Sequence, residues 1–309
     1  MNYPPQFVDD VYRIFGDQGR AWLPRLPELL AQCRERWSLP EGVPCPTMSM
    51  NYIEFTTTAA GEPVALKVGV PHAELFTEMQ ALRFYDGRGA ARLIDADRDL
   101  GAILMQRAQP GTMLWQVGDN AEQTRNAATV MRVLSRPVPE RHALPHFTQW
   151  VERAFRLTRT EWDPQERMPR ELLVAAEEAL AELLQASTGD VILHGDLHHE
   201  NILWDAEAGW LAIDPKGVIG PRSLEVGRFI QNQLPEGAPI EDWEMLVRER
   251  IAIFSAELGM TPQAVAAGAL VDCVLSHCWC FEEEALSPDW DDGVALGYTL
   301  RRLWYTPRL

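Results

Sequence analysis

Strand-like patterns in this chain of 309 residues are concentrated between about residues 47 and 106. Within this part, two runs rich in β-branched and apolar residues flank a turn at 60–63, which predicts a β-hairpin. The other elements expected up to residue 106 are helices over 7–16 and 20–37, a helix over about 72–85, and short strands around 91–96 and 100–106. Together these elements predict a small antiparallel sheet with a helix packed on it.

Helical patterns occupy most of the chain beyond residue 108. They cover residues 113–134, 146–158, 168–186, 222–232, 240–258, 262–286 and 291–304. One β-bearing segment interrupts them, with the sequence VILHGDLHHENILW followed by GWLAIDPKGVIG. We therefore expect an α+β fold with a small N-terminal β-rich lobe, residues 1–106, and a larger, mainly helical C-terminal lobe, residues 107–309.

The interrupting segment has the clearest chemical signature in the sequence. Asp196 lies two residues after His194 and five before Asn201, and Asp214 follows thirteen residues later at the end of an apolar strand. Phosphoryl transfer needs a carboxylate at the acceptor hydroxyl and oxygen ligands for magnesium ions. The spacing Asp-x-x-x-x-Asn, with His two residues before the Asp, is that of kinase catalytic loops. Asp and Asn are also common in turns, but the order of all four residues between two strands favours catalysis.

Lysine is rare in this chain, since Lys67 and Lys216 are the only two among 28 basic residues. An ammonium is a compact point charge on a flexible stem, which a guanidinium is not. Lys67 lies in the strand VALKV, and Glu78 follows eleven residues later on the predicted helix, where it can hold the lysine at the nucleotide phosphates. Glu74 competes for this pairing, and both glutamates also fit the solvated face of a helix.

At this point the sequence resembles a known family. The segments HGDLHHENIL, AIDPKGVIG, VALKVGVPHAELFTEMQALRFYDGRGAARLIDAD and the late SHCW are similar to the aminoglycoside/hydroxyurea antibiotic-resistance kinases, over about residues 20–304. The resemblance implies a bilobal protein-kinase-like fold. It also implies ATP- and Mg²⁺-dependent phosphorylation of a small-molecule hydroxyl, such as the 6-hydroxyl of streptomycin.

The resemblance assigns roles to particular residues. Asp196 would act at the acceptor hydroxyl as base or positioning group, Asn201 and Asp214 would hold magnesium, and Lys67 with Glu78 would grip the phosphates. Further expected roles are hydrogen-bonding support of the loop by His194, contacts of the backbone at Gln106 and Ala108 with the adenine, and a structural anchor for the loop at Glu225.

Two features depart from the pattern of protein kinases. The segment TMSMNYIEFTTT lacks the G-x-G-x-x-G motif, so backbone amides and side chains around Ser49 and Asn51 would have to hold the phosphates. Lys216 lies two residues after Asp214, in IDPKG, where protein kinases have a DFG-type sequence. Its ammonium would either neutralise charge on the transferred phosphate or fix the turn through a salt bridge.

The charge balance bears on the substrate. A net charge of −17, from 28 basic and 45 acidic residues, disfavours a nucleic acid or an anionic membrane as partner. It favours a cationic or polyhydroxylated small molecule, with Glu282, Glu283 and Trp279 as candidate contacts. Successive helical residues turn by about 100°, so at most one or two glutamates of the acidic run would face one pocket. The same glutamates also fit a solvated face, and Trp279 fits the core.

The sequence also bears on the location of the protein and on alternative functions. The longest apolar stretch, 265–281, is interrupted by Asp272, Ser276 and His277, and the start of the chain lacks a secretory signal, so we expect a cytoplasmic protein. Besides an aminoglycoside kinase, a kinase of another small hydroxylated metabolite fits, and a nucleotide-binding pseudokinase fits less well. The sequence leaves ATP against GTP open and implies no obligate protein partner.

Overall fold

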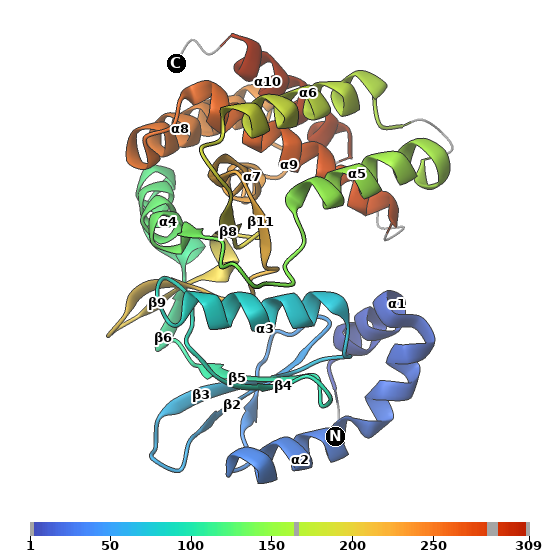
Figure 1. Cartoon of the computed structure of the whole chain (residues 1–309), viewed down its shortest axis with the longest axis vertical. Helices are drawn as coiled ribbons and strands as arrows, with labels where there is room; N and C mark the ends of the chain where they lie inside the picture. The colour runs from blue at the N-terminus through green and yellow to red at the C-terminus, as the bar shows by residue number, and fades with distance from the viewer. Residues whose placement is uncertain (1–2, 164–166, 283–289, 307–309) are drawn as a thin grey trace.

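The computed structural model describes residues 3–163, 167–282 and 290–306, and it has a sheet-rich N-terminal part and a helical C-terminal part (Figure 1). The sheet has five strands in the order β1-β2-β3-β5-β4. Their bounds are Val43–Pro44 for β1, Tyr52–Thr57 for β2, Pro63–Val68 for β3, Leu93–Asp97 for β4 and Ala102–Gln106 for β5. Every neighbouring pair is antiparallel, so the expected sheet is confirmed.

The two faces of this sheet bury different side chains because successive residues of a strand point to opposite sides. Val64, Leu66 and Val68 of β3 belong to one hydrophobic cluster, together with α1 (Pro5–Trp22) and α2 (Leu26–Trp37). Ala65 belongs to the other cluster, with α3 (Ala73–Tyr85) and the helical part. Lys67 has the same parity as Ala65, so the alternation directs it toward the helical part.

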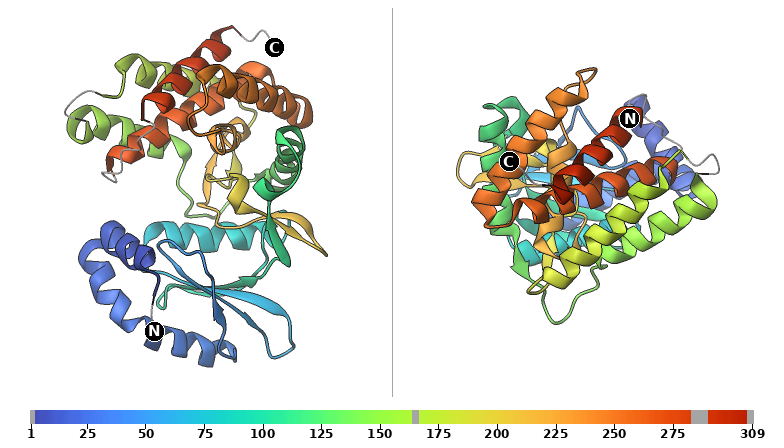
Figure 2. Two further views of the ribbon diagram at one scale, coloured as in Figure 1. Left: turned by 180° about the vertical axis from the view of Figure 1, so that it is seen from behind. Right: turned by 90° about the horizontal axis from the view of Figure 1, so that it is seen from above.

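Helix α3 lies between the sheet and the helical part, α2 lies on the opposite face, and α1 runs along one end of the sheet from the level of α3 toward α2 (Figure 1; Figure 2 shows the same arrangement from behind). The helical part consists of α4 (Asn120–Leu134), α5 (Phe147–Leu157), α6 (Arg170–Ala186), α7 (Gly227–Gln231), α8 (Ile240–Leu258), α9 (Pro262–Glu282) and α10 (Trp290–Tyr305).

By length and composition, helix α9 could cross a membrane. This corrects the expectation that its polar residues make it too polar for a membrane span. However, 72% of its apolar window is buried inside the protein, as in the core helix of a globular domain.

Two small sheets hold the segments with the chemical motif. In one, β8 (Val191–Leu193) pairs with β11 (Val218–Gly220), so the loop that leaves β8 lies beside the loop that enters β11. In the other, β9 (Ile202–Asp205) and β10 (Gly209–Ala212) form a hairpin whose open end pairs Ile202 with Ala212. Asn201 and Asp214 flank this open end, so the register brings them together.

Most of the elements expected from the sequence are confirmed, but the helix expected at 113 is wrong at its start. Pro110–Met113 forms strand β6, which pairs with β9, and α4 begins only at Asn120. Asp119 caps α4 by accepting a hydrogen bond from the backbone of Glu122, which sets the first turn there. The short strand β7 (Arg136–Pro137) was also not expected.

Candidate active site

A cavity of about 230 Å³ lies between the small sheet and the helical part. Its lining contains eight residues expected to act in phosphoryl transfer: Ser49, Asn51, Lys67, Glu78, Asp196, Asn201, Asp214 and Lys216. The remaining lining residues are Met50, His72, Glu74, Leu75, His198 and Pro215. Segments separated by more than a hundred residues in the chain therefore meet in one cleft.

Lys67 connects the two sides of this cleft. Its Nζ lies 2.8 Å from Oε1 and 2.9 Å from Oε2 of Glu78, and 3.1 Å from Oδ1 of Asp214. Glu74 lies one helical turn before Glu78 on α3 and does not contact Lys67; it pairs with Lys216 instead. Since the Lys67 side chain is only 3% exposed, its charge depends on these carboxylates.

The charges in this cluster support one another. Burial opposes the charge of Lys67, but the carboxylates of Asp214 and Glu78 outweigh burial and raise its pKa. Burial likewise opposes the charge of Asp214, and the Lys67 ammonium overcomes it and lowers the pKa of Asp214. For Glu78, burial dominates over the attraction of Lys67 and raises its pKa to about 7. Asp214 therefore carries the firmer negative charge in the cleft.

The loop with Asp196 is held from behind by buried groups. Glu225 accepts hydrogen bonds from the backbone amides of His194, at 2.6 Å, and Gly195, at 3.1 Å, which is the anchoring role expected for it. His194 accepts from the amide of Asp196 through Nδ1 and therefore donates through Nε2 to the carbonyl of Ile213, at 2.7 Å. Burial lowers the pKa of His194 to about 4, so the ring is neutral and acts as a brace.

Asn201 and Asp214 present oxygen atoms of the kind that magnesium prefers. The side-chain nitrogen of Asn201 donates to the carbonyl of Asp196 at 2.9 Å and contacts His198 Nε2 at 3.1 Å. This orientation leaves the amide oxygen of Asn201 available. Asp214 uses Oδ1 for Lys67, so Oδ2 remains available beside it. The donor set thus fits a hard divalent cation.

Ser49 and Asn51 lie in the segment between β1 and β2, at the edge of the cleft. The Oδ1 atom of Asn51 is buried and has no hydrogen-bond partner in the described part of the chain. Gln106 and Ala108 are not in the cavity lining. The amide of Gln106 donates to the carbonyl of Arg92 at 2.9 Å, so that group is already occupied.

The substrate candidates Glu282 and Trp279 do not line the cleft. Glu282 forms a two-pronged ion pair with Arg153, so its carboxylate is already neutralised. Glu283 lies outside the described residues. Trp279 packs edge-on against Trp150, with ring centroids 5.7 Å apart, and is half-buried near the cleft.

The sequence motifs did not identify Arg228, which lies on α7 close to the carboxylate of Asp196. Its Nε is 3.3 Å from Oδ1 of Asp196 and 3.5 Å from Oδ2 of Asp272. Nothing in the residue type marks it among the many arginines of the chain. A usable signal was Asp272, a carboxylate in the middle of a long apolar helix, because such a charge needs a buried partner.

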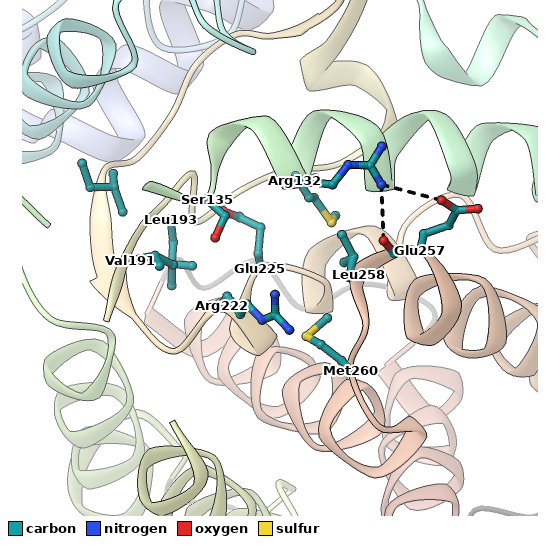
Figure 3. A pocket seen from close by; sticks show the side chains of 11 residues that line it. Arg132, Ser135, Val191, Leu193, Arg222, Glu225, Glu257, Leu258 and Met260 are labelled. Atoms are coloured by element: carbon teal, nitrogen blue, oxygen red, sulfur yellow. Dashed lines mark hydrogen bonds and ion pairs between the residues drawn. The ribbon is translucent and has the colours of Figure 1, made fainter. Parts of the chain in front are cut away.

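A second cavity of about 240 Å³ lies behind the catalytic loop, between α4, β8 and the end of α8 (Figure 3). Leu193, Arg222, Glu225 and Met260 are among its lining residues. None of the residues expected to touch nucleotide, metal or acceptor lines it. The cleft with Lys67 and Asp196 is therefore the candidate active site.

The sequence is similar to several curated kinases and phosphotransferases. The chain is 27% identical over 286 residues to streptomycin 6-kinase of Streptomyces griseus, covering 92% of each chain. It is 30% identical over 300 residues to hydroxyurea phosphotransferase of Kitasatospora aureofaciens, covering 96% of this chain and 85% of that one. It is also 30% identical over 257 residues to streptomycin 3''-kinase of Klebsiella pneumoniae, covering 79% of this chain and 90% of that one.

Solved structures establish the kinase-like fold. Choline kinase LicA from Streptococcus pneumoniae superposes with a TM-score of 0.61 at 10% identity, covering 89% of this chain and 99% of that one. Aminoglycoside phosphotransferase APH(4)-Ia superposes with a TM-score of 0.59 at 12% identity, covering 90% and 98%. The family model described as aminoglycoside/hydroxyurea antibiotic resistance kinase matches residues 36–284. The chain is therefore a kinase that belongs to the aminoglycoside/hydroxyurea antibiotic resistance kinase family.

Proposed function

We propose that this protein is an ATP- and Mg²⁺-dependent O-phosphotransferase whose acceptor is an aminoglycoside such as streptomycin, at its 6-hydroxyl. Residues 1–106 would form the nucleotide lobe, and residues 107–309 would carry the catalytic loop and the acceptor site. The observation that supports the proposal most is the shared cleft, in which Lys67, Asp196, Asn201 and Asp214 come together from three separate segments. A cytoplasmic location fits this activity, because ATP is available there.

The proposed reaction needs a phosphoryl donor, a charge-stabilising cation and an aligned acceptor. Mg-ATP, when bound, supplies the phosphoryl group and part of the charge neutralisation. Asn201 and Asp214 would hold the metal through their free oxygens. Lys67, fixed by Glu78, would hold the phosphates in position.

Asp196 would act on the acceptor. One carboxylate oxygen faces Arg228, and the other remains available to accept the hydrogen bond of a substrate hydroxyl. The Asp196 carboxylate would orient the hydroxyl oxygen for in-line attack and take up its proton as the new phosphate ester forms and the bond to the departing nucleoside diphosphate breaks. Lys216, whose raised pKa results from Glu74 and Asp196 outweighing burial, would add positive charge beside the transferred group.

The structure and the relatives also support a second candidate acceptor. The relatives are named for different acceptors, namely streptomycin at its 6 or 3'' position, and hydroxyurea. Glu282, one of the acidic residues expected to attract a polycation, is already paired with Arg153. This pairing favours, as the second candidate, a kinase of a smaller and less cationic alcohol with the same catalytic core.

A turnover assay separates these candidates. The purified protein is incubated with Mg-ATP or Mg-GTP and a panel of streptomycin, other aminoglycosides, hydroxyurea and small amino alcohols, and nucleotide diphosphate release is followed. We expect ADP release with streptomycin and a loss of at least about 100-fold in kcat for Asp196→Ala, with nucleotide binding retained.

Two results would count against the proposal. Turnover of another alcohol but not of streptomycin would select the second candidate. Near-normal turnover by Asp196→Ala, with binding unchanged, would remove Asp196 from the reaction.

A further inference from the structure

The structure assigns Arg228 a role as the positioning residue for the Asp196 carboxylate, held in place by Asp272 and Trp279 of α9. This inference rests on the proposed phosphotransferase function. It concerns a residue that has no place in the catalytic motifs of the sequence. The following geometry carries it.

The Nε atom of Arg228 lies close to two carboxylates, those of Asp196 and Asp272. Its Nε is 3.3 Å from Asp196 and 3.5 Å from Asp272, and this buried nitrogen makes no hydrogen bond within the described residues. Burial opposes the charge of Arg228, but Asp272 and Asp196 outweigh burial and raise its pKa. A permanent cation therefore faces the carboxylate that would act on the acceptor.

Helix α9 provides a matching face for this arginine. Asp272, Ser276 and Trp279 follow the spacing i, i+4, i+7, which places them on one side of a helix. Asp272 pairs with the arginine, and the guanidinium carbon lies 5.7 Å from the centre of the Trp279 ring. Gln231 bridges Asp272 and Ser276 by hydrogen bonds. The SHCW segment of the sequence thus contributes to holding Arg228.

The backbone of α7 is also fixed in a way that serves this contact. Gly227 packs so closely on α9 that a Cβ atom there would lie 2.3 Å from the Cβ of Asp272. From the other side, Arg250 donates to the carbonyls of Phe229, Ile230 and Asn232 at 2.6 to 3.0 Å. Arg228 therefore projects from a rigid support, as a group that orients another side chain must.

The contact explains why arginine suits this position. A guanidinium is planar and its charge is delocalised, so Arg228 can lie over the ring of Trp279 while its Nε lies close to both carboxylates. A lysine ammonium, in contrast, has no planar face to stack on the Trp279 ring. With Arg228 as the ion-pair partner of Oδ1 of Asp196, the second carboxylate oxygen would be left for the acceptor hydroxyl.

The test compares Arg228→Ala, Arg228→Lys and the double variant R228A/D272N with the wild type, using the acceptor that the wild type turns over. Arg302→Ala is the matched control, because Arg302 is exposed and pairs with Glu244 away from the cleft. We expect kcat to fall by about 10- to 100-fold in Arg228→Ala while the KM for Mg-ATP stays within about 2-fold. Arg228→Lys should lie between this variant and the wild type.

The double variant separates positioning from folding. Arg228→Ala leaves Asp272 buried without its cation, which can unfold the protein, whereas R228A/D272N removes that charge as well. We expect the double variant to recover the melting temperature of the wild type but to keep the low kcat. Wild-type kcat in the double variant would overturn the inference and leave Arg228 as the counter-ion of Asp272. If the wild type itself turns over no acceptor, the proposed function fails first, and the inference fails with it.

Discussion

At the residue scale, the charges that are buried in the site are each paired with a specific partner. Lys67 has Glu78 and Asp214, and Glu225 has two backbone amides of the catalytic loop. Each buried charge without such a partner would destabilise the folded protein by about several kcal/mol. The local geometry is therefore determined by charge pairing as much as by packing.

The neutral brace His194 gives a pH-dependent prediction. Its ring is fully buried, and its pKa falls from 6.5 to about 4 in the folded protein. Between these values the unfolded chain takes up a proton on His194 and the folded protein does not, so acidification favours unfolding. Relative to His194→Gln, which cannot titrate, the wild type should lose up to roughly 3 kcal/mol of unfolding free energy between pH 7.5 and pH 4.

Chemical denaturation at several pH values measures this difference. Parallel stability curves for the wild type and His194→Gln would show that the histidine is accessible to protons in the folded state. Glu225, whose pKa burial raises to about 7, titrates with the opposite sign in both proteins and cancels in the comparison.

The residues of the catalytic motif could be predicted because their spacing is local and distinctive. Asp196 and Asn201 share one loop, and the strand register then fixes Asp214 beside them. Arg228 could not be predicted in this way, because its role depends on the packing of α7 on α9 and not on neighbours in the sequence. For the same reason, the sequence could not identify the partner of Lys216, because Glu74 lies 142 residues away in the chain.

At the scale of elements, close helix packing decides where the functional side chains lie. Gly227 and Gly268 allow α7 and the preceding turn to approach α9. A Cβ atom at Gly268 would lie 2.0 Å from the carbonyl oxygen of Ser223. The periodicity of the sequence predicts helices over 222–232 and 262–286. It cannot show that these two segments contact each other at glycine residues, because the contact depends on how the helices pack in the folded protein.

Gly227→Ala tests this contact. The new methyl group would meet the Cβ of Asp272 and, at 2.9 Å, the carbonyl oxygen of Gly268, and neither can move freely. We expect a loss of about 1–3 kcal/mol in unfolding free energy and a lower kcat, because Arg228 moves with α7. In the control Gly297→Ala, the nearest atom is a terminal methyl of Leu172 at 3.0 Å, which can rotate away. Equal losses in both variants would refute the special role of the α7–α9 contact.

At the scale of the whole molecule, a few contacts connect the sheet-rich part to the helical part near the cleft. Lys67 reaches Asp214, and the hydroxyl of Thr77 donates to the carbonyl of Lys216 at 2.6 Å. Lys216 itself reaches Glu74 on α3. The α+β architecture follows from the order of patterns in the sequence, but these connections depend on how α3 sits over the helical part.

Two roles were expected for Lys216, neutralisation of phosphate charge and a salt bridge that fixes the turn, and kinetics can separate them. Its partner Glu74 is 45% exposed at the side chain, and exposed ion pairs contribute only about 0–1 kcal/mol. Lys216 also lines the cleft beside Asp196, where its charge would act on the transferred phosphate. We therefore expect Lys216→Met to lower kcat by at least about 10-fold and Glu74→Gln by no more than about 3-fold.

Steady-state kinetics with saturating Mg-ATP measures both variants side by side, and thermal unfolding checks that each is folded. If Lys216 only fixed the turn, removing either partner would break the same ion pair, and the two variants would lose activity and stability to the same small extent. A large loss confined to Lys216→Met requires its charge at the phosphate, because the turn keeps the Thr77 hydrogen bond to the backbone of residue 216 in both variants.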